Sequence, residues 1–128
     1  PIFYGKDLVY NFPEIYVPKK NDIIILTNQN EYYLYLLKLL IEREIGKNVT
    51  LSDGKLYLEG KELIQWKIKE NYYFAMGDNR DFSEDCRYFG FIPESKIFGS
   101  IMFRYWPLHR ISFIINENEK SILHMNYY

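Results

Sequence analysis

The chain has 128 residues, a length typical of one domain with a hydrophobic core. Its 16 lysines and arginines are balanced by 17 aspartates and glutamates, so it lacks the net positive field that would attract nucleic acid. The single cysteine, Cys86, excludes an internal disulfide and a cysteine-ligated metal cluster, and the histidines, His109 and His124, are not spaced as metal ligands. We therefore expect neither a metal nor another cofactor.

Aromatic residues make up 19% of the chain. Such side chains pack well on pleated sheets, so the composition favours a β fold; it also fits a protein that exposes aromatics at a membrane interface. The longest apolar run, residues 32–41, is about half the length of a membrane span and contains Lys38. Because the chain begins with Pro1 rather than methionine, we expect a trimmed or mature piece of a longer protein.

The first part of the chain is expected to alternate loops and short strands. Residues 1–10 are typical of a turn followed by a short strand, and residues 11–22 contain two prolines, which favours a surface loop. Residues 23–26, IIIL, have the pattern of a buried strand. Residues 32–44, YYLYLLKLLIERE, are ambiguous: their Leu and Glu content favours a helix, but the preceding turn and the length also permit a long strand, which we predict.

The clearest local pattern is VTLSDGKLYLEGKEL, residues 49–63. Two alternating runs flank Asp53-Gly54, a dipeptide that accepts positive φ and is typical of hairpin turns. Residues 64–71 are interpreted as a linker. Four more strands are expected: residues 72–76, 89–93, 94–108 with a bulge at Gly99, and 110–115. The sequence thus predicts a mainly β, mostly antiparallel domain over residues 1–115 and a polar, frayed tail over residues 116–128.

Residues 77–90, GDNRDFSEDCRYFG, concentrate charges and hydrogen-bonding groups between an apolar lead-in and an aromatic exit. This stretch closely resembles the last sequence box of the type I signal peptidases, which reads GDNRDxSxDSR followed by an aromatic residue and a glycine. The one departure in the polar part is Cys86, where that family usually has serine. A motif this long and polar is far more specific than an isolated glycine pattern.

The resemblance extends over most of the chain. KKNDIIIL, residues 19–26, is similar to the family's Lys/Arg-Gly-Asp-Ile-Val-Val strand, and residues 49–63 resemble the hairpin that follows its catalytic lysine. PIFYGKDLVY resembles the stretch just after the nucleophile, a register that puts the nucleophilic serine three residues before Pro1. The resemblance implies the twisted antiparallel sheets of the signal peptidase I fold. Because no large insertion lies between Gly60 and Tyr72, the compact Gram-positive form is expected.

Type I signal peptidases cleave precursors with a Ser/Lys dyad. A lysine, whose ordinary pKa is about 10.4, must be buried against apolar groups before it can act as a neutral base. The resemblance implies that Ser83 orients this lysine. The other residues of the motif would hold the turn, and we expect a structural role for all of them: Gly77, Asp78, Asn79, Arg80, and a salt bridge between Asp85 and Arg87. A salt-bridged β-turn without any catalytic link is the alternative.

The lysine itself departs from the family pattern. Alignment back from the hairpin through Gly46 places Leu39 at the lysine position, with Lys38 one residue away. In a strand, a shift of one residue turns the side chain to the opposite face. Either a bulge after Lys38 restores its direction, which would make it the general base, or the base is absent and Lys38 is a solvated surface lysine.

Two functions follow from the resemblance. An active peptidase would bind its substrate by β-augmentation along residues 32–37, with Tyr33, Tyr35 and Leu37 lining the groove. A degenerate relative would keep the groove, bind signal-peptide-bearing precursors or pilins, and assist pilus assembly without proteolysis. The damaged lysine box favours the degenerate relative. In both cases the resemblance implies a location at the outer face of the cytoplasmic membrane, held by an anchor upstream of Pro1, with exposed aromatics touching the bilayer.

Overall fold

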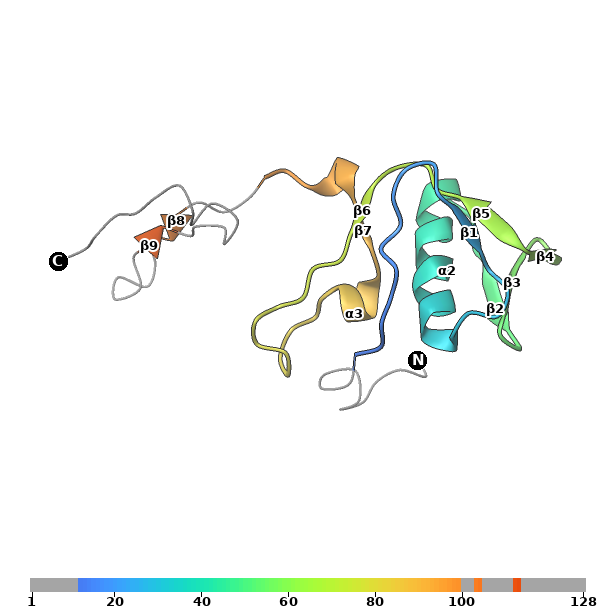
Figure 1. The fold of residues 1–128 in the computed structure, drawn as a ribbon, viewed down its shortest axis with the longest axis horizontal. Coiled ribbons are helices and arrows are strands. Elements are labelled where there is room, and N and C mark those ends of the chain that lie inside the picture. Colours follow the sequence, from blue (N-terminus) through green and yellow to red (C-terminus); the bar gives the residue numbers. More distant parts are fainter. Residues whose placement is uncertain (1–11, 100–102, 105–111, 114–128) are drawn as a thin grey trace. The chain divides into compact units, whose positions relative to one another are not determined.

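The computed structural model describes residues 12–99, 103–104 and 112–113 (Figure 1). The chain divides into two compact units, Pro1–Ile97 and Phe98–Tyr128. The first unit contains these elements in order: β1 (Ile23–Ile25), α2 (Glu31–Ile45), β2 (Thr50–Ser52), β3 (Lys55–Leu58), β4 (Lys61–Leu63), β5 (Gln65–Lys67), β6 (Tyr72–Tyr73), α3 (Cys86–Phe89), β7 (Ile92–Pro93) and the 3-10 turn η1 (Glu94–Lys96). In the second unit, β8 (Phe103–Arg104) pairs with β9 (Ser112–Phe113).

All strand pairs in the described residues are antiparallel: β1 with β5, β2 with β3 and β4, β6 with β7, and β8 with β9. The prediction of a mainly β, antiparallel fold is thus confirmed. The predicted hairpin is also present, since Asp53 and Gly54 join β2 to β3 with φ values of 51° and 68°. These positive φ angles are the reason why Asp-Gly suits this turn.

Helix α2 corrects the strand predicted over residues 32–44. The side chain of Asn30 accepts a hydrogen bond from the Tyr33 amide and caps the first turn, while Gly46, with φ 67°, ends the helix in the left-handed conformation. Between these caps, buried side chains recur at the three- and four-residue spacing of a helix: Tyr33, Leu36, Leu37, Leu40 and Ile41. The strand prediction gave the preceding turn too much weight and the caps too little.

The core of the first unit is built around α2. Figure 1 shows the helix with β1, β5 and the β2–β4 sheet on one side, and with β6, β7 and α3 on the other. Leu34, Leu36 and Leu40 are completely buried. On the α3 side the core is aromatic: Phe12 meets Tyr32 edge-on, with ring centroids 5.6 Å apart. Helix α2 thus fixes both halves of this unit.

Two further predictions need correction. Residues 64–71, interpreted as a linker, contain β5, in which Trp66 pairs with Ile24 of β1. Residues 94–96, expected in a strand, form the 3-10 turn η1. The strand predicted over residues 1–10 and the tail 116–128 lie outside the described residues. No described helix has both the length and the apolar character that crossing a membrane requires.

Candidate functional site

The loop that leads from β6 to α3 is organised by a buried ion pair between Asp85 and Arg87. Arg87 is 1% exposed, and its Nε and Nη2 donate to the two carboxylate oxygens of Asp85 at 2.8 and 2.9 Å. The same carboxylate accepts hydrogen bonds from the backbone amides of Gly77 and Arg87. Arg87 Nη2 also donates to the carbonyl of Arg80. The expected salt bridge is therefore present and ties both ends of the loop together.

These contacts keep Asp85 ionised. Its burial works against ionisation, but the hydrogen bonds from the Arg87 side chain and the Gly77 amide outweigh burial and lower the pKa of Asp85. The same hydrogen bond to Asp85 raises the pKa of Arg87, against the effect of burial. Ionisation and folding of the loop are thus coupled, because the charges stabilise each other where water does not reach them.

Ser83 is held inside this loop. Its Oγ donates to the carbonyl of Asn79 at 2.7 Å, and the residue packs directly onto Gly77. A Cβ on Gly77 would lie 2.6 Å from Ser83 Cβ and closer still to Oγ, so a glycine is required here for space. Ser83 also lines a surface hollow of about 490 Å³, together with Asp81, Phe82, Glu84, Tyr88 and Phe89.

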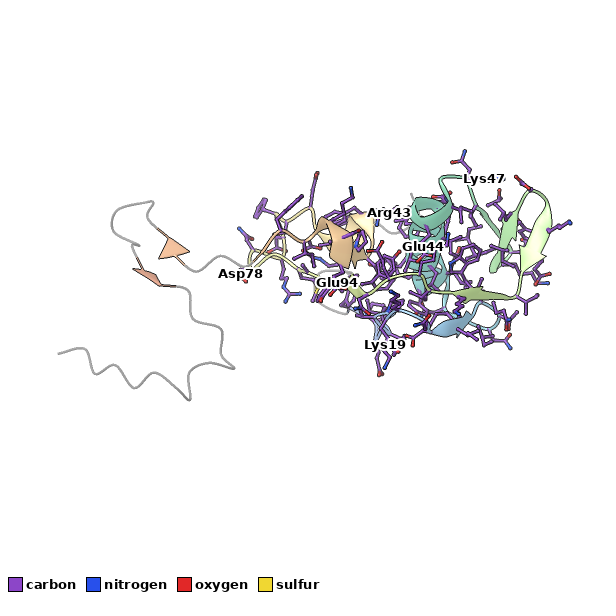
Figure 2. The ribbon with its side chains drawn as sticks, turned by 90° about the horizontal axis from the view of Figure 1, so that it is seen from above. Lys19, Arg43, Glu44, Lys47, Asp78 and Glu94 are labelled. Atoms are coloured by element: carbon purple, nitrogen blue, oxygen red, sulfur yellow. The ribbon has the colours of Figure 1, made fainter. Side chains whose placement is uncertain are left out.

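The other motif residues contribute differently from what their side chains suggest. Asn79 and Arg80 supply backbone carbonyls to Ser83 and Arg87, and the Arg80 guanidinium points to Met76 Sδ. Asp78 is exposed and projects from the tip of the loop (Figure 2). Cys86 is buried, and its Sγ accepts a hydrogen bond from the Ala75 amide, so a thiol takes the place of the family's serine hydroxyl without loss of an acceptor.

Lys38 lies on α2 and is partly buried, with 24% of its side chain exposed. Its Nζ donates to Glu42 Oε1 at 2.8 Å, one helical turn away, and the same oxygen accepts from the Val49 amide at 2.8 Å. Lys38 is thus part of a local link between α2 and the start of β2. Leu39, the residue expected from the resemblance at the family's lysine position, packs on Gly90: its Cδ1 would lie 3.3 Å from a Cβ on that glycine.

The three residues expected in a substrate groove are also on the helix. Tyr33 and Leu37 are 5% and 1% exposed, and burial raises the pKa of Tyr33 to about 12. Tyr35 donates its hydroxyl to the Tyr88 carbonyl at 3.3 Å. Because a helix satisfies its own backbone groups, residues 32–37 offer no strand edge for β-augmentation.

Comparison with known proteins decides the family. The model of the signal peptidase family, peptidase S26, matches residues 62–106. Signal peptidase IB of Staphylococcus aureus is 42% identical over 114 residues, which cover 88% of this chain and 59% of that protein. The chain belongs to the type I signal peptidase family.

Other members of the family give the same result. Signal peptidase I of Bacillus caldolyticus is 35% identical over 109 residues, 82% of this chain and 55% of that protein. A probable signal peptidase I-2 of Synechocystis is 29% identical over 94 residues, 63% of this chain and 43% of that protein. The chain thus spans 43–59% of the length of these three relatives. No solved structure matches it.

Side chains of α2 also bind backbone carbonyls in and directly after the family motif. The sequence alone did not reveal these contacts. Tyr32 donates its hydroxyl to the Arg87 carbonyl at 2.7 Å. Arg43 donates to the carbonyls of Phe89 and Phe91, the latter at 2.8 Å. These side chains satisfy backbone acceptors of α3 and of Phe91, the residue before β7. Arg43 could have been suspected, since basic residues in a last helical turn often bind carbonyls.

Glu44 is a second structural centre that sequence analysis missed. Its carboxylate accepts hydrogen bonds from Trp66 Nε1 at 2.7 Å, from the Tyr72 hydroxyl at 2.9 Å and from the Lys69 amide at 2.9 Å. Burial and the hydrogen bond to Glu44 raise the pKa of Tyr72.

Among the described residues, no group of three His, Cys, Asp or Glu side chains could hold a metal ion.

Proposed function

We propose that this chain is a signal-peptidase-like protein that binds extended segments of precursor polypeptides or pilins at the cell surface and assists pilus assembly without cleaving them. The supporting observation is that the expected general base and the hydroxyl expected to orient it are both engaged by local partners. Lys38 Nζ is paired with Glu42 on its own helix, and Ser83 Oγ donates to Asn79 in its own loop.

The dyad chemistry explains why this matters. A lysine base must present a neutral amine to the nucleophile, and a hydroxyl that orients the base must direct its oxygen at that amine. Here a carboxylate holds the Lys38 ammonium, and the resemblance aligns Leu39 rather than Lys38 with the family's lysine. Consecutive side chains on a helix point in directions roughly 100° apart around its axis. The Lys38 side chain therefore does not point where the Leu39 side chain points.

An active signal peptidase is the second candidate function. The observation that favours it is the loop around Ser83, in which the family's Asp–Arg ion pair and its glycine are intact. The matched relatives in Staphylococcus aureus and Bacillus caldolyticus are named signal peptidases. In this case the nucleophile would be a serine upstream of Pro1, and Lys38 would leave Glu42 to reach it.

Cleavage of a precursor separates the two functions. The protein, with the residues that precede Pro1 in its gene, is incubated in detergent with a precursor that carries an Ala-x-Ala site, and both binding and cleavage are measured. Our proposal expects binding without product. Cleavage that disappears in Lys38→Met and persists in Glu42→Gln would instead establish the peptidase, because both substitutions break the ion pair but only the first removes an amine.

We further propose that the protein acts at the extracytoplasmic face of the membrane, held by an anchor outside residues 1–128. The family relationship supports this location, and fully exposed Phe98 is a candidate for contact with the bilayer. Phe98→Ser should reduce co-sedimentation with phosphatidylcholine vesicles. Unchanged sedimentation would remove the aromatic contact and leave the anchor as the only attachment.

A further inference from the structure

A hollow with basic walls lies where the turn before β1 meets the end of β5, two strands that run side by side (Figure 1). This basic hollow measures about 490 Å³ and is lined by Asn21, Trp66, Lys67, Ile68 and Lys69. These described walls supply two ammonium groups, a primary amide and an indole, and none of them is a carboxylate. Lys67 and Lys69 are exposed, so a ligand in solution can reach their charges.

The backbone that carries these walls is fixed by hydrogen bonds. Lys67 belongs to β5, which pairs with β1, and the Asn21 amide donates to the Ile68 carbonyl at 3.0 Å. The Lys69 amide donates to Glu44 Oε1 at 2.9 Å. A ligand therefore does not have to order this part of the chain, which lowers the entropy cost of binding.

No ion pair neutralises the two lysines within the described part of the chain. The Lys67 side chain makes no hydrogen bond or salt bridge there. Lys69 Nζ donates to a neutral acceptor, the Glu44 carbonyl, at 3.0 Å. The Glu44 carboxylate is close in sequence space to neither lysine and is not a wall of the basic hollow; it accepts hydrogen bonds from Trp66, Tyr72 and the Lys69 amide.

The charges just outside the walls do not change this picture. Lys19 and Lys20 are exposed in the turn that leads into β1. Asp22, in the same turn, accepts hydrogen bonds from a tyrosine hydroxyl and from the Lys19 amide, and Glu70 accepts one from a backbone amide of η1. These carboxylates thus have donors of their own, and the salt bridges of the described residues involve none of the four lysines.

Asn21 adds a directed hydrogen-bond donor. Its φ is 73°, in the left-handed region that favours glycine, and the signal peptidase pattern that residues 19–26 resemble has glycine at this position. The Asn21 side-chain amide makes no hydrogen bond with the described residues, so both of its N–H groups can donate to a ligand. The chain thus has an amide where glycine would be the least strained residue, and a bound acceptor would give that amide a partner.

We propose that the basic hollow binds the phosphate group of a phosphate monoester whose organic part lies against the Trp66 indole. Such a phosphate carries about −1.5 to −2 charges at neutral pH and three acceptor oxygens. These match two ammonium groups and one amide donor, and lysine is a common phosphate ligand in proteins. A carboxylate has a single charge and would use the same walls less completely. This inference is independent of the proposed function, because it involves neither Lys38 nor Ser83.

Phenyl phosphate tests the site. It is titrated into the labelled protein at neutral pH and constant ionic strength, and the amide and indole signals are followed by NMR. We expect saturable shifts of Asn21, of residues 66–69 and of the Trp66 indole. Phenylacetate, a carboxylate of similar size, should bind about fivefold more weakly, the effect of about one exposed charge pair. Absence of saturable shifts would overturn the site, and equal affinities would overturn the phosphate assignment.

Asn21→Gly separates binding from folding. Glycine accepts the positive φ, so this variant should be at least as stable as the wild type in urea. Because it lacks the amide donor, it should bind phenyl phosphate about threefold more weakly. A variant that binds as tightly as the wild type would remove Asn21 from the site and overturn the assignment of its amide.

Lys67→Gln tests the charge and should weaken binding of phenyl phosphate about fivefold. Lys61→Gln is the matched control, because Lys61 is also an exposed lysine of a short strand, β4, but is not a wall of the basic hollow. This control should bind as the wild type does. Equal weakening in both variants would overturn the site, since it would show general charge attraction without a defined position.

Vesicles distinguish two sources of the phosphate. Phosphatidic acid presents a phosphate monoester at a bilayer surface, and phosphatidylcholine vesicles serve as the reference. Displacement of phenyl phosphate by phosphatidic acid vesicles alone would identify a lipid headgroup as the ligand, and no displacement would identify a soluble phosphate ester; both results keep the site. Equal displacement by phosphatidylcholine, which lacks a monoester, would overturn the phosphate assignment.

Discussion

The family motif at residues 77–90 and helix α2 lie against each other, yet their side chains are fixed in different ways. Within the motif, Asp85, Arg87 and Ser83 bind partners that are two to eight residues away. On α2, Tyr32 and Arg43 bind backbone groups that are 46 to 55 residues away. The motif is thus a local device that a sequence can specify by itself, whereas the helix depends on distant contacts. Substitutions in each region should show this difference.

The largest effect is expected from Arg87→Met. This change leaves the Asp85 carboxylate buried without its partner, and breaking a buried pair in this way costs about 3–5 kcal/mol. The free energy of unfolding, measured by urea denaturation, should fall by this amount. Arg80→Met removes an exposed guanidinium from the same loop and serves as the control, with a change within about 0.5 kcal/mol. Equal effects of both substitutions would contradict the buried ion pair as the organiser of the loop.

Gly77→Ala should cost about 1–3 kcal/mol, because the new methyl group would overlap with Ser83. A double-mutant cycle identifies the cause. Ser83→Gly removes both the Cβ and the Oγ that crowd Gly77, so it should recover most of the loss, whereas Ser83→Ala keeps the Cβ and should recover less. Additive losses in the two double variants would mean that Gly77 is needed for some reason other than this contact.

On the helix side, Glu44→Gln tests the long-range connections of α2. The amide keeps the shape of the carboxylate but has only one oxygen to accept the bonds from Trp66, Tyr72 and Lys69. We expect the free energy of unfolding to fall by about 1–2 kcal/mol. We also expect the emission maximum of Trp66 in the folded protein to change, because its indole loses a hydrogen-bond partner. Glu14→Gln, at an exposed site, is the matched control and should leave both measurements unchanged.

Acid should destabilise the motif through Asp85. Its pKa is lowered in the folded state, so its contribution to stability is present above the pKa of the unfolded chain, about 3.9, and disappears as the pH falls through the folded value. Unfolding free energies measured between about pH 6 and pH 2 should therefore decline less steeply in Asp85→Asn than in the wild type. Asp78→Asn, at the exposed tip of the loop, should keep the wild-type decline.

The same contrast explains which parts of the fold could be predicted. The Asp53-Gly54 hairpin and the Asp85–Arg87 pair depend on neighbouring residues, and both are present as expected. For residues 32–44, the Asn30 cap and Gly46 were the local signals of a helix, and the strand prediction was wrong because it gave more weight to the preceding turn and the length of the run.

Other features had no signal in the sequence. Trp66 was assigned to a linker because nothing local shows that it pairs with Ile24 or that Glu44 holds its indole. The docking of Tyr32 on the Arg87 carbonyl is likewise a property of the folded chain, since it joins residues 55 positions apart. The candidate site is therefore predictable where the motif is local, and it is not predictable where α2 meets it.

Lys38→Met should have the smallest effect on stability, and this makes it informative. A partly exposed pair four residues apart on a helix contributes about 0.3–0.5 kcal/mol, and methionine keeps both the helix propensity and the apolar stem. Glu42→Gln should cost more than Lys38→Met, because Glu42 also accepts the Val49 amide and so joins α2 to β2. The opposite result would be that Lys38→Met stabilises the protein by about 1 kcal/mol or more, roughly the gain expected when strain at a functional site is relieved. That result would mean that the lysine destabilises the fold, and it would strengthen the case for a catalytic amine.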